Sequence, residues 1–155
     1  MVTTDEKAEG WTTLKFLRII VAQHPQIRVL LDVGAQILDL SNIQVAEAWL
    51  GCTPAADTIG AIFFSENDEL MMLARNGIAQ PLSSSPLAQQ LHRCVAYLDC
   101  AHTRGTDLKF PVGFRAAVTL GHKVTKDRLV QGISKPQLCN RRILSSISIR
   151  LHANA

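Results

Sequence analysis

The chain has 155 residues, the length of a single domain that can bury one hydrophobic core. Hydrophobic residues make up 47% and charged residues 19% of it, a balance that argues against a disordered chain and against a membrane protein. No apolar run approaches the roughly 20 residues that cross a bilayer, and residues 1–10 lack the apolar segment of a secretion signal. We therefore expect a cytoplasmic or nuclear protein without a membrane partner.

The net charge of +3 is unevenly distributed along the chain. Residues 1–131 contain 12 Lys and Arg against 13 Asp and Glu, whereas residues 132–155 contain four basic residues and no acidic one. The basic excess belongs to the tail, so the body of the chain offers no electrostatic basis for binding nucleic acid. The four cysteines are expected to be reduced thiols, because no export signal is present.

Five short apolar runs have the composition of strands. They span residues 27–33, 58–64, 70–74, 94–98 and 115–120. A polar turn at 65–68 joins the second run to the third as a hairpin, and another turn follows at 75–77.

Helices are expected between these strands. Ser41 and Gln44 have the spacing of a capping box, which begins a helix that Gly51 ends. A Ser-rich connector at 81–86 leads to a short helix at 87–92, with a proline at its first position. The alternation of strands and helices predicts an α/β fold, with helices on the faces of a mostly parallel sheet.

The two ends of the chain do not follow this pattern. Residues 1–10 are polar and expected to be disordered, and residues 11–22 are expected to form a helix whose packing partners lie outside the chain. A last helix is expected from Thr125. Residues 132–155 are interpreted as an aberrant basic tail, poorly ordered, in which residues 145–151 alternate like a strand but have no evident partner.

The segment richest in reactive side chains, residues 99–109, directly follows the apolar run 94–98. Open α/β sheets bind their ligands beyond the carboxyl ends of their strands, so this segment is the predicted site. Asp32 also follows a predicted strand, and we interpret it as a cap of that strand end.

Histidines and cysteines flank this strand in the pattern H-x-C-x5-C-x-H, at His92, Cys94, Cys100 and His102. In an extended segment the two cysteines lie roughly 20 Å apart, too far for one tetrahedral zinc ion, so no metal and no other cofactor is predicted. Cys100 and His102 are weak candidates for a catalytic nucleophile and its base, because side chains two residues apart on a strand share a face.

Residues 103–107 allow two further interpretations. Their hydroxyls, guanidinium, glycine and carboxylate suit the recognition of a nucleotide or a polymer, but they also suit a tight turn. No G-x-x-x-x-G-K-[ST] loop occurs in the sequence, so the chain cannot hold a triphosphate in the P-loop manner.

Four strings of this sequence resemble one segment of a family of very large, mainly fungal proteins. They are VLLDVGAQILDLSN (29–42), AIFFSENDEL (61–70), LDCAHTRGTDLKFP (98–111) and AAVTLGxKVTKDRLVQ (116–131). The family is described as ubiquitinyl hydrolases, cysteine-type deubiquitinases of the ovarian-tumour class that also contain domains of unknown function.

Within that family the segment is similar to the second RecA-like lobe of superfamily 2 helicases and of the bacterial preprotein translocase ATPase. Residues 104–109 (RGTDLK) match the fifth motif of the translocase, and residues 128–131 (RLVQ) match the start of the sixth. The resemblance implies a RecA-like three-layer lobe over residues 11–131. It assigns the following residues to a cleft: Asp99, His102, Thr103, Arg104, Gly105, Thr106, Asp107, Lys109 and Gln131.

The chain departs from the family where Asp99-Cys100-Ala101-His102 stands in place of the usual D-E-A-H, so Cys100 is not expected to be the family's nucleophile. The resemblance implies a fragment of a deubiquitinase, inactive alone, whose partners are ubiquitin or ubiquitinated proteins and the remaining domains of its parent. Two alternatives stay open: a helicase-like NTP-binding motor lobe, and a non-enzymatic interaction scaffold.

Overall fold

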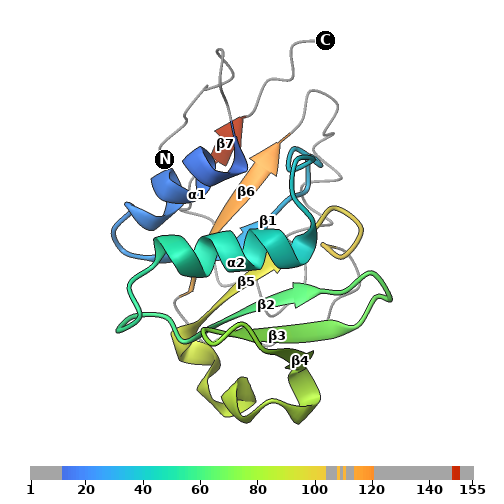
Figure 1. The fold of residues 1–155 in the computed structure, drawn as a ribbon. Coiled ribbons are helices and arrows are strands. Elements are labelled where there is room, and N and C mark those ends of the chain that lie inside the picture. The colour runs from blue at the N-terminus through green and yellow to red at the C-terminus, as the bar shows by residue number, and fades with distance from the viewer. Residues whose placement is uncertain (1–11, 104–107, 109, 111–113, 121–147, 151–155) are drawn as a thin grey trace.

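The structure, a computed structural model, describes residues 12–103, 108, 110, 114–120 and 148–150. Within these residues, seven strands form one sheet in the order β4-β3-β2-β5-β1-β6-β7 (Figure 1). The strands are β1 (Ile27–Leu31), β2 (Gly60–Phe64), β3 (Leu70–Ala74), β4 (Ala79–Pro81), β5 (Cys94–Leu98), β6 (Arg115–Leu120) and β7 (Ser148–Arg150). The pairs β2–β3 and β3–β4 are antiparallel, and the other four pairs are parallel. The predicted mostly parallel α/β sheet is confirmed.

All five predicted strands are present, and the sequence pattern missed two strand pairings at the edges of the sheet. β4 is only three residues long and returns beside β3 after a turn in which Gly77 has a φ of +84°. The segment 145–151, for which the sequence showed no evident partner, contributes β7, which pairs in parallel with β6. A parallel pairing over such a distance in sequence leaves no local signal.

Two α-helices, α1 (Thr13–Val21) and α2 (Asn42–Cys52), lie on the same face of the sheet (Figure 1). Phe16, Leu17 and Ile20 of α1 are at most 1% exposed and belong to the core cluster that also contains α2. The expectation that this first helix has its packing partners outside the chain is therefore wrong. Its apolar side packs inside the domain.

The capping box predicted at Ser41 begins α2, but the helix does not end at Gly51 as predicted. It continues through Gly51 to Cys52, and a side chain from another element satisfies the backbone carbonyls at its end. The Arg75 guanidinium donates to the carbonyls of Leu50 (2.8 Å) and Thr53 (2.6 Å). A cation at the helix C-terminus also complements the helix dipole.

The opposite face of the sheet is covered by two 3-10 helices, η1 (Leu82–Ser84) and η2 (Pro86–Arg93). The second is the short helix predicted there, and it tightens to 3-10 geometry. Leu108, Phe110 and Phe114 join the same apolar cluster from the segment between β5 and β6. The sheet is therefore packed on both faces, which is the usual setting of parallel strands.

The central strand β5 shows how the two faces are built. Val95 and Tyr97 point into the cluster under the α-helices, and Cys94, Ala96 and Leu98 point into the cluster under the 3-10 helices. All five side chains are buried. This alternation fixes the register of β5 and thus the position of the residues that follow it.

Three predictions for the chain ends fall outside the described residues: disorder at 1–10, the helix from Thr125, and the character of 132–155 apart from β7. In the part of the chain that the structure describes, no helix has the length and apolar character needed to cross a bilayer.

Candidate functional site

The candidate site lies where the parallel strands β1, β5 and β2 end. The register pairs Leu31 of β1 with Leu98 of β5, so the residues that follow these strands are neighbours. The chain after β1 leads to α2 on one face of the sheet, whereas the chain after β5 places Leu108 and Phe110 on the other face. Such a divergence of neighbouring connections opens the crevice in which open α/β sheets bind ligands.

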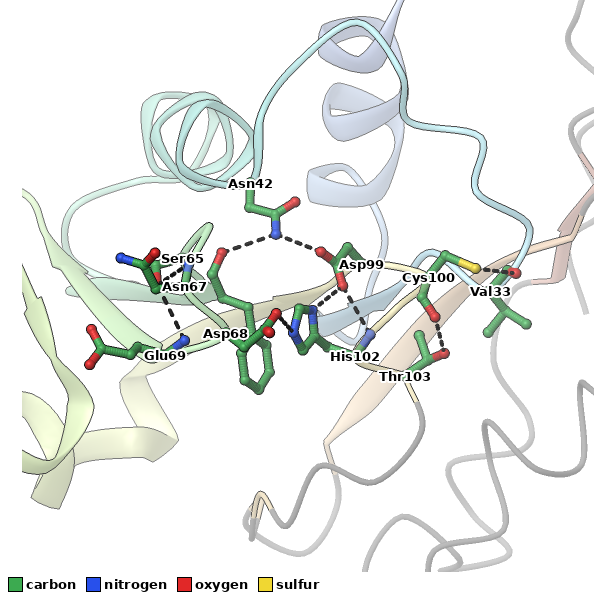
Figure 2. Close-up of polar contacts among 11 residues, drawn as sticks. Val33, Asn42, Ser65, Asn67, Asp68, Glu69, Asp99, Cys100, His102 and Thr103 are labelled. Atoms are coloured by element: carbon green, nitrogen blue, oxygen red, sulfur yellow. Dashed lines mark hydrogen bonds and ion pairs between the residues drawn. The ribbon is translucent and has the colours of Figure 1, made fainter.

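Asp99, the first residue after β5, is held by side chains and backbone from two elements (Figure 2). One carboxylate oxygen, Oδ2, accepts a hydrogen bond of 2.7 Å from the Asn42 amide at the start of α2. The other, Oδ1, accepts from the backbone N–H of His102 at 3.0 Å and lies 2.5 Å from its ring Nδ1. The same Asn42 amide donates to the carbonyl of Phe64 at the end of β2 (3.0 Å), so one side chain ties the helix start to both strand ends.

His102 is fixed on three sides. Its ring stacks on Phe64 with the centroids 3.9 Å apart and the planes 5° apart. Its Nδ1 faces Asp99, and its Nε2 lies 2.9 Å from Oδ1 of Asp68 in the β2–β3 turn. The Asp68 backbone has a φ of +59°, which aspartate tolerates better than most residues. Figure 2 shows the imidazole between the two carboxylates.

These side chains border a cavity of about 650 Å³, a volume typical of small-molecule sites. Among the residues that the structure describes, its lining combines an apolar floor with acidic side chains and includes no lysine or arginine. The lining residues are Ser41, Asn42, Ile43, Phe63, Phe64, Ser65, Glu66, Asn67, Asp68, Met71, Ala79, Asp99, Ala101 and His102. An acidic wall of this kind disfavours a phosphate group.

The predicted pair of Cys100 and His102 is not arranged as a nucleophile and its base. The Cys100 thiol is exposed and donates a weak bond, 3.5 Å long, to the carbonyl of Val33 after β1. The His102 ring nitrogens face carboxylates instead. Thr103, assigned to the cleft, is 5% exposed, and its hydroxyl donates to the Cys100 carbonyl at 3.1 Å. The Thr103 hydroxyl therefore stabilises the turn and is not directed at a ligand.

Asp32 is a cap of its strand end, as predicted. The carboxylate is 2% exposed and accepts from the backbone N–H groups of Gln36 (2.9 Å) and Ile37 (3.1 Å). The hydroxyl of Thr119 on β6 donates to it as well. Its partners among the described residues are all groups of the fold, as expected for a cap.

Two buried side chains of β5 stay protonated. Burial raises the pKa of the Tyr97 phenol far above its ordinary value, and the carboxylates of Asp32 and Asp99 push it in the same direction. Burial also raises the pKa of the Cys94 thiol, to about 11, although Arg28 and Arg93 lower it in part. Neither group is suited to exchange a proton near neutral pH.

The other predicted cleft residues, Arg104, Gly105, Thr106, Asp107, Lys109 and Gln131, lie outside the described residues. Sequence reasoning missed Asn42, Phe64 and Asp68. The capping box located the start of α2, and the polar turn located Asp68, but neither pattern indicates a contact with residues 99–102.

The geometry supports proton transfer better than metal or phosphate binding. An imidazole oriented by a carboxylate is a feature of general bases, and here the second ring nitrogen, Nε2, lies beside Asp68 at the edge of the cavity. Within the described ranges, no three His, Cys, Asp or Glu side chains gather as a metal site. No family model, no curated protein and no solved structure matches this chain.

Proposed function

We propose that this chain is a RecA-like α/β lobe of a ubiquitinyl-hydrolase-like protein, and that His102, oriented by Asp99, is a general base in its cleft. The lobe works together with the remaining domains of a larger parent, on ubiquitin or a ubiquitinated protein, in the cytoplasm or nucleus. Isolated, it is inactive, because Cys100 does not supply the nucleophile.

The contact between His102 Nδ1 and the Asp99 carboxylate carries this proposal. A carboxylate only accepts hydrogen bonds, so the ring proton stays on Nδ1 and the other nitrogen, Nε2, is the one that can accept a proton. Asp99 is itself held by Asn42, and Phe64 fixes the plane of the ring. A base needs this kind of support from a second layer of contacts to keep its orientation.

The position of the Cys100 thiol supports a nucleophile elsewhere in the parent. The thiol is directed to the carbonyl of Val33, and no base contacts it among the described residues. A cysteine nucleophile requires a base within hydrogen-bond reach to form the thiolate.

The test is hydrolysis of a fluorogenic ubiquitin amide by the full-length parent and its variants. His102→Asn, which cannot accept a proton, is expected to lower kcat by about 10²–10⁴-fold. Cys100→Ser is expected to leave kcat within about twofold, because the hydroxyl can make the same contact with Val33. His92→Asn is the matched control, since His92 is exposed and does not line the cavity.

Two results contradict the proposal. Loss of hydrolysis in Cys100→Ser would make Cys100 the nucleophile. Full activity of His102→Asn, with activity present in the parent, would remove the role of the base. A ubiquitin probe that labels a cysteine of the parent outside this segment supports it.

The divergence of the connections after β1 and β5 also favours a second candidate, a nucleotide-driven motor lobe, because nucleotides bind at such points in open α/β sheets. Nucleotide-dependent turnover that is lost in Asp107→Ala supports this function. The acidic lining of the cavity argues against it. Absence of both activities supports the third candidate, an interaction scaffold.

A further inference from the structure

Both ring nitrogens of His102 lie within hydrogen-bond distance of a carboxylate, at 2.5 Å for Asp99 and 2.9 Å for Asp68. A neutral imidazole has one N–H donor, and a carboxylate has none. Two such contacts at once therefore require the doubly protonated imidazolium. When the ring loses a proton, one of the two contacts becomes a repulsion between lone pairs.

The two contacts differ in how strongly they are held. The Asp99 side chain is 23% exposed and is anchored by Asn42 and by the backbone N–H of His102. The Asp68 side chain is 82% exposed, so water replaces its partner at little cost. When the ring loses one proton, the proton on Nδ1 remains hydrogen-bonded to Asp99. Asp68 is then the carboxylate that moves away from the ring.

We propose that Asp68 is a pH-dependent gate over Nε2 of His102. At acid pH the imidazolium holds Asp68 across the edge of the cavity. At higher pH the Asp68 side chain turns away and releases Nε2, which can then act as a base. The value of this opening for catalysis rests on the proposed function, but the gate itself is a property of the described residues.

The turn that carries Asp68 keeps its shape when the gate opens. The backbone N–H of Ser65 donates to the Glu69 carbonyl at 2.9 Å, and that of Asp68 donates to the Ser65 carbonyl at 3.1 Å. The Ser65 hydroxyl accepts from the backbone N–H groups of Asn67 and Glu69. These bonds do not involve the Asp68 carboxylate, so the movement is confined to that side chain.

Among the described residues, the charged side chains that line the cavity beside the ring are carboxylates. Glu66 and Asp68 come from the β2–β3 turn and Asp99 from the end of β5, whereas α2 contributes the uncharged Asn42 and Ile43. Asp68 and Asp99 are the carboxylates within hydrogen-bond distance of the ring nitrogens, so a variant of Asp68 can be compared with a variant of Glu66.

NMR titration of the 155-residue chain between pH 5 and 8.5 tests the gate. Above the titration midpoint of His102, the ring ¹⁵N shifts are expected to show the proton on Nδ1. The Asp68 β-methylene couplings are expected to change from one rotamer to an average over several, with the same midpoint, while those of Asp99 stay constant. Asp68→Asn, which removes the carboxylate beside Nε2, is expected to move the midpoint down.

Glu66→Gln is the matched control, because it removes the same charge from the same turn without touching the ring. Its shift is expected to be clearly smaller than that of Asp68→Asn. The gate is refuted if the neutral ring carries its proton on Nε2, if the Asp68 rotamer ignores the titration, or if both variants shift the midpoint equally. None of these measurements needs hydrolase activity, so a failed ubiquitin assay overturns the proposed function alone.

Discussion

Asp32 and Asp99 stand directly after the neighbouring strands β1 and β5, and the register of these strands makes them counterparts at one edge of the sheet. Their surroundings differ. Asp32 is 2% exposed and its partners come from its own loop and from β6. The Asp99 side chain is 23% exposed, touches a helix start and a histidine, and borders a cavity.

The difference shows what separates a carboxylate that only caps its strand from one at the candidate site in the same position. Asp32 closes its strand end because the partners of its oxygens are buried N–H and O–H groups that need an acceptor. Asp99 uses its oxygens to orient a second titratable group, His102, which faces solvent-accessible space. Asp32 and Asp99 are the same residue type and follow their strands at matching positions, so their different contacts distinguish them.

Truncation of Asp32 is expected to have the largest effect on stability. Asp32→Ala leaves the buried N–H groups of Gln36 and Ile37 and the Thr119 hydroxyl without their acceptor. Because each buried unpaired group costs about 1–3 kcal/mol, we expect the free energy of unfolding to fall by about 3–4 kcal/mol. Urea denaturation followed by circular dichroism measures the loss.

Asp99→Ala is the matched variant across the sheet. Its loss is expected to be about 1 kcal/mol, because water can reach the groups left behind. Equal losses in the two variants would mean that the two strand ends do not differ as their contacts indicate.

A charge placed at Asn42 is expected to have an intermediate effect. Asn42→Asp replaces the donor to Asp99 by a second carboxylate at about the same distance, 2.7 Å. We expect a loss of about 2 kcal/mol at pH 7, less the few tenths that a carboxylate gains at a helix N-terminus. As the pH falls to about 4, one carboxyl takes up a proton and the loss should shrink.

Asn42→Ala separates the lost hydrogen bonds from the repulsion. It removes the same donor without adding a charge, so its loss of about 1 kcal/mol should depend less on pH than that of Asn42→Asp. Parallel behaviour of the two variants in urea titrations would show that Asn42 and Asp99 do not interact in solution.

The sequence was sufficient for features encoded by neighbouring residues. The apolar run 94–98 predicted β5 and located Asp99 at its end, and the spacing of Ser41 and Gln44 predicted the start of α2. Such features depend on periodicity and on hydrogen bonds within a few residues, so they can be predicted without knowing the tertiary structure.

The site itself depends on contacts between distant residues, which the same patterns do not encode. Asn42 and Asp99 are 57 residues apart in sequence, and Asp68 and His102 are 34 apart. They meet because β5 inserts between β1 and β2, an order that local composition cannot distinguish from others. For the same reason the packing of α1 against α2 was not predicted.

The weakest link between the two strand ends is the bond from the Cys100 thiol to the Val33 carbonyl, and its loss is expected to have the smallest effect. Cys100→Ser should change the free energy of unfolding by less than about 0.5 kcal/mol, since the site is exposed.

The exposed Cys100 thiol should also react freely with alkylating reagents. At the other end of β5, burial raises the pKa of Cys94 to about 11, so that thiol holds roughly a hundredfold less thiolate than an ordinary cysteine. Iodoacetamide should therefore modify the exposed Cys100 much faster than the buried Cys94 in the folded chain, and both equally in urea, as peptide mass spectrometry would measure. Slow modification of Cys100 in the folded chain would mean that this strand end is closed rather than open.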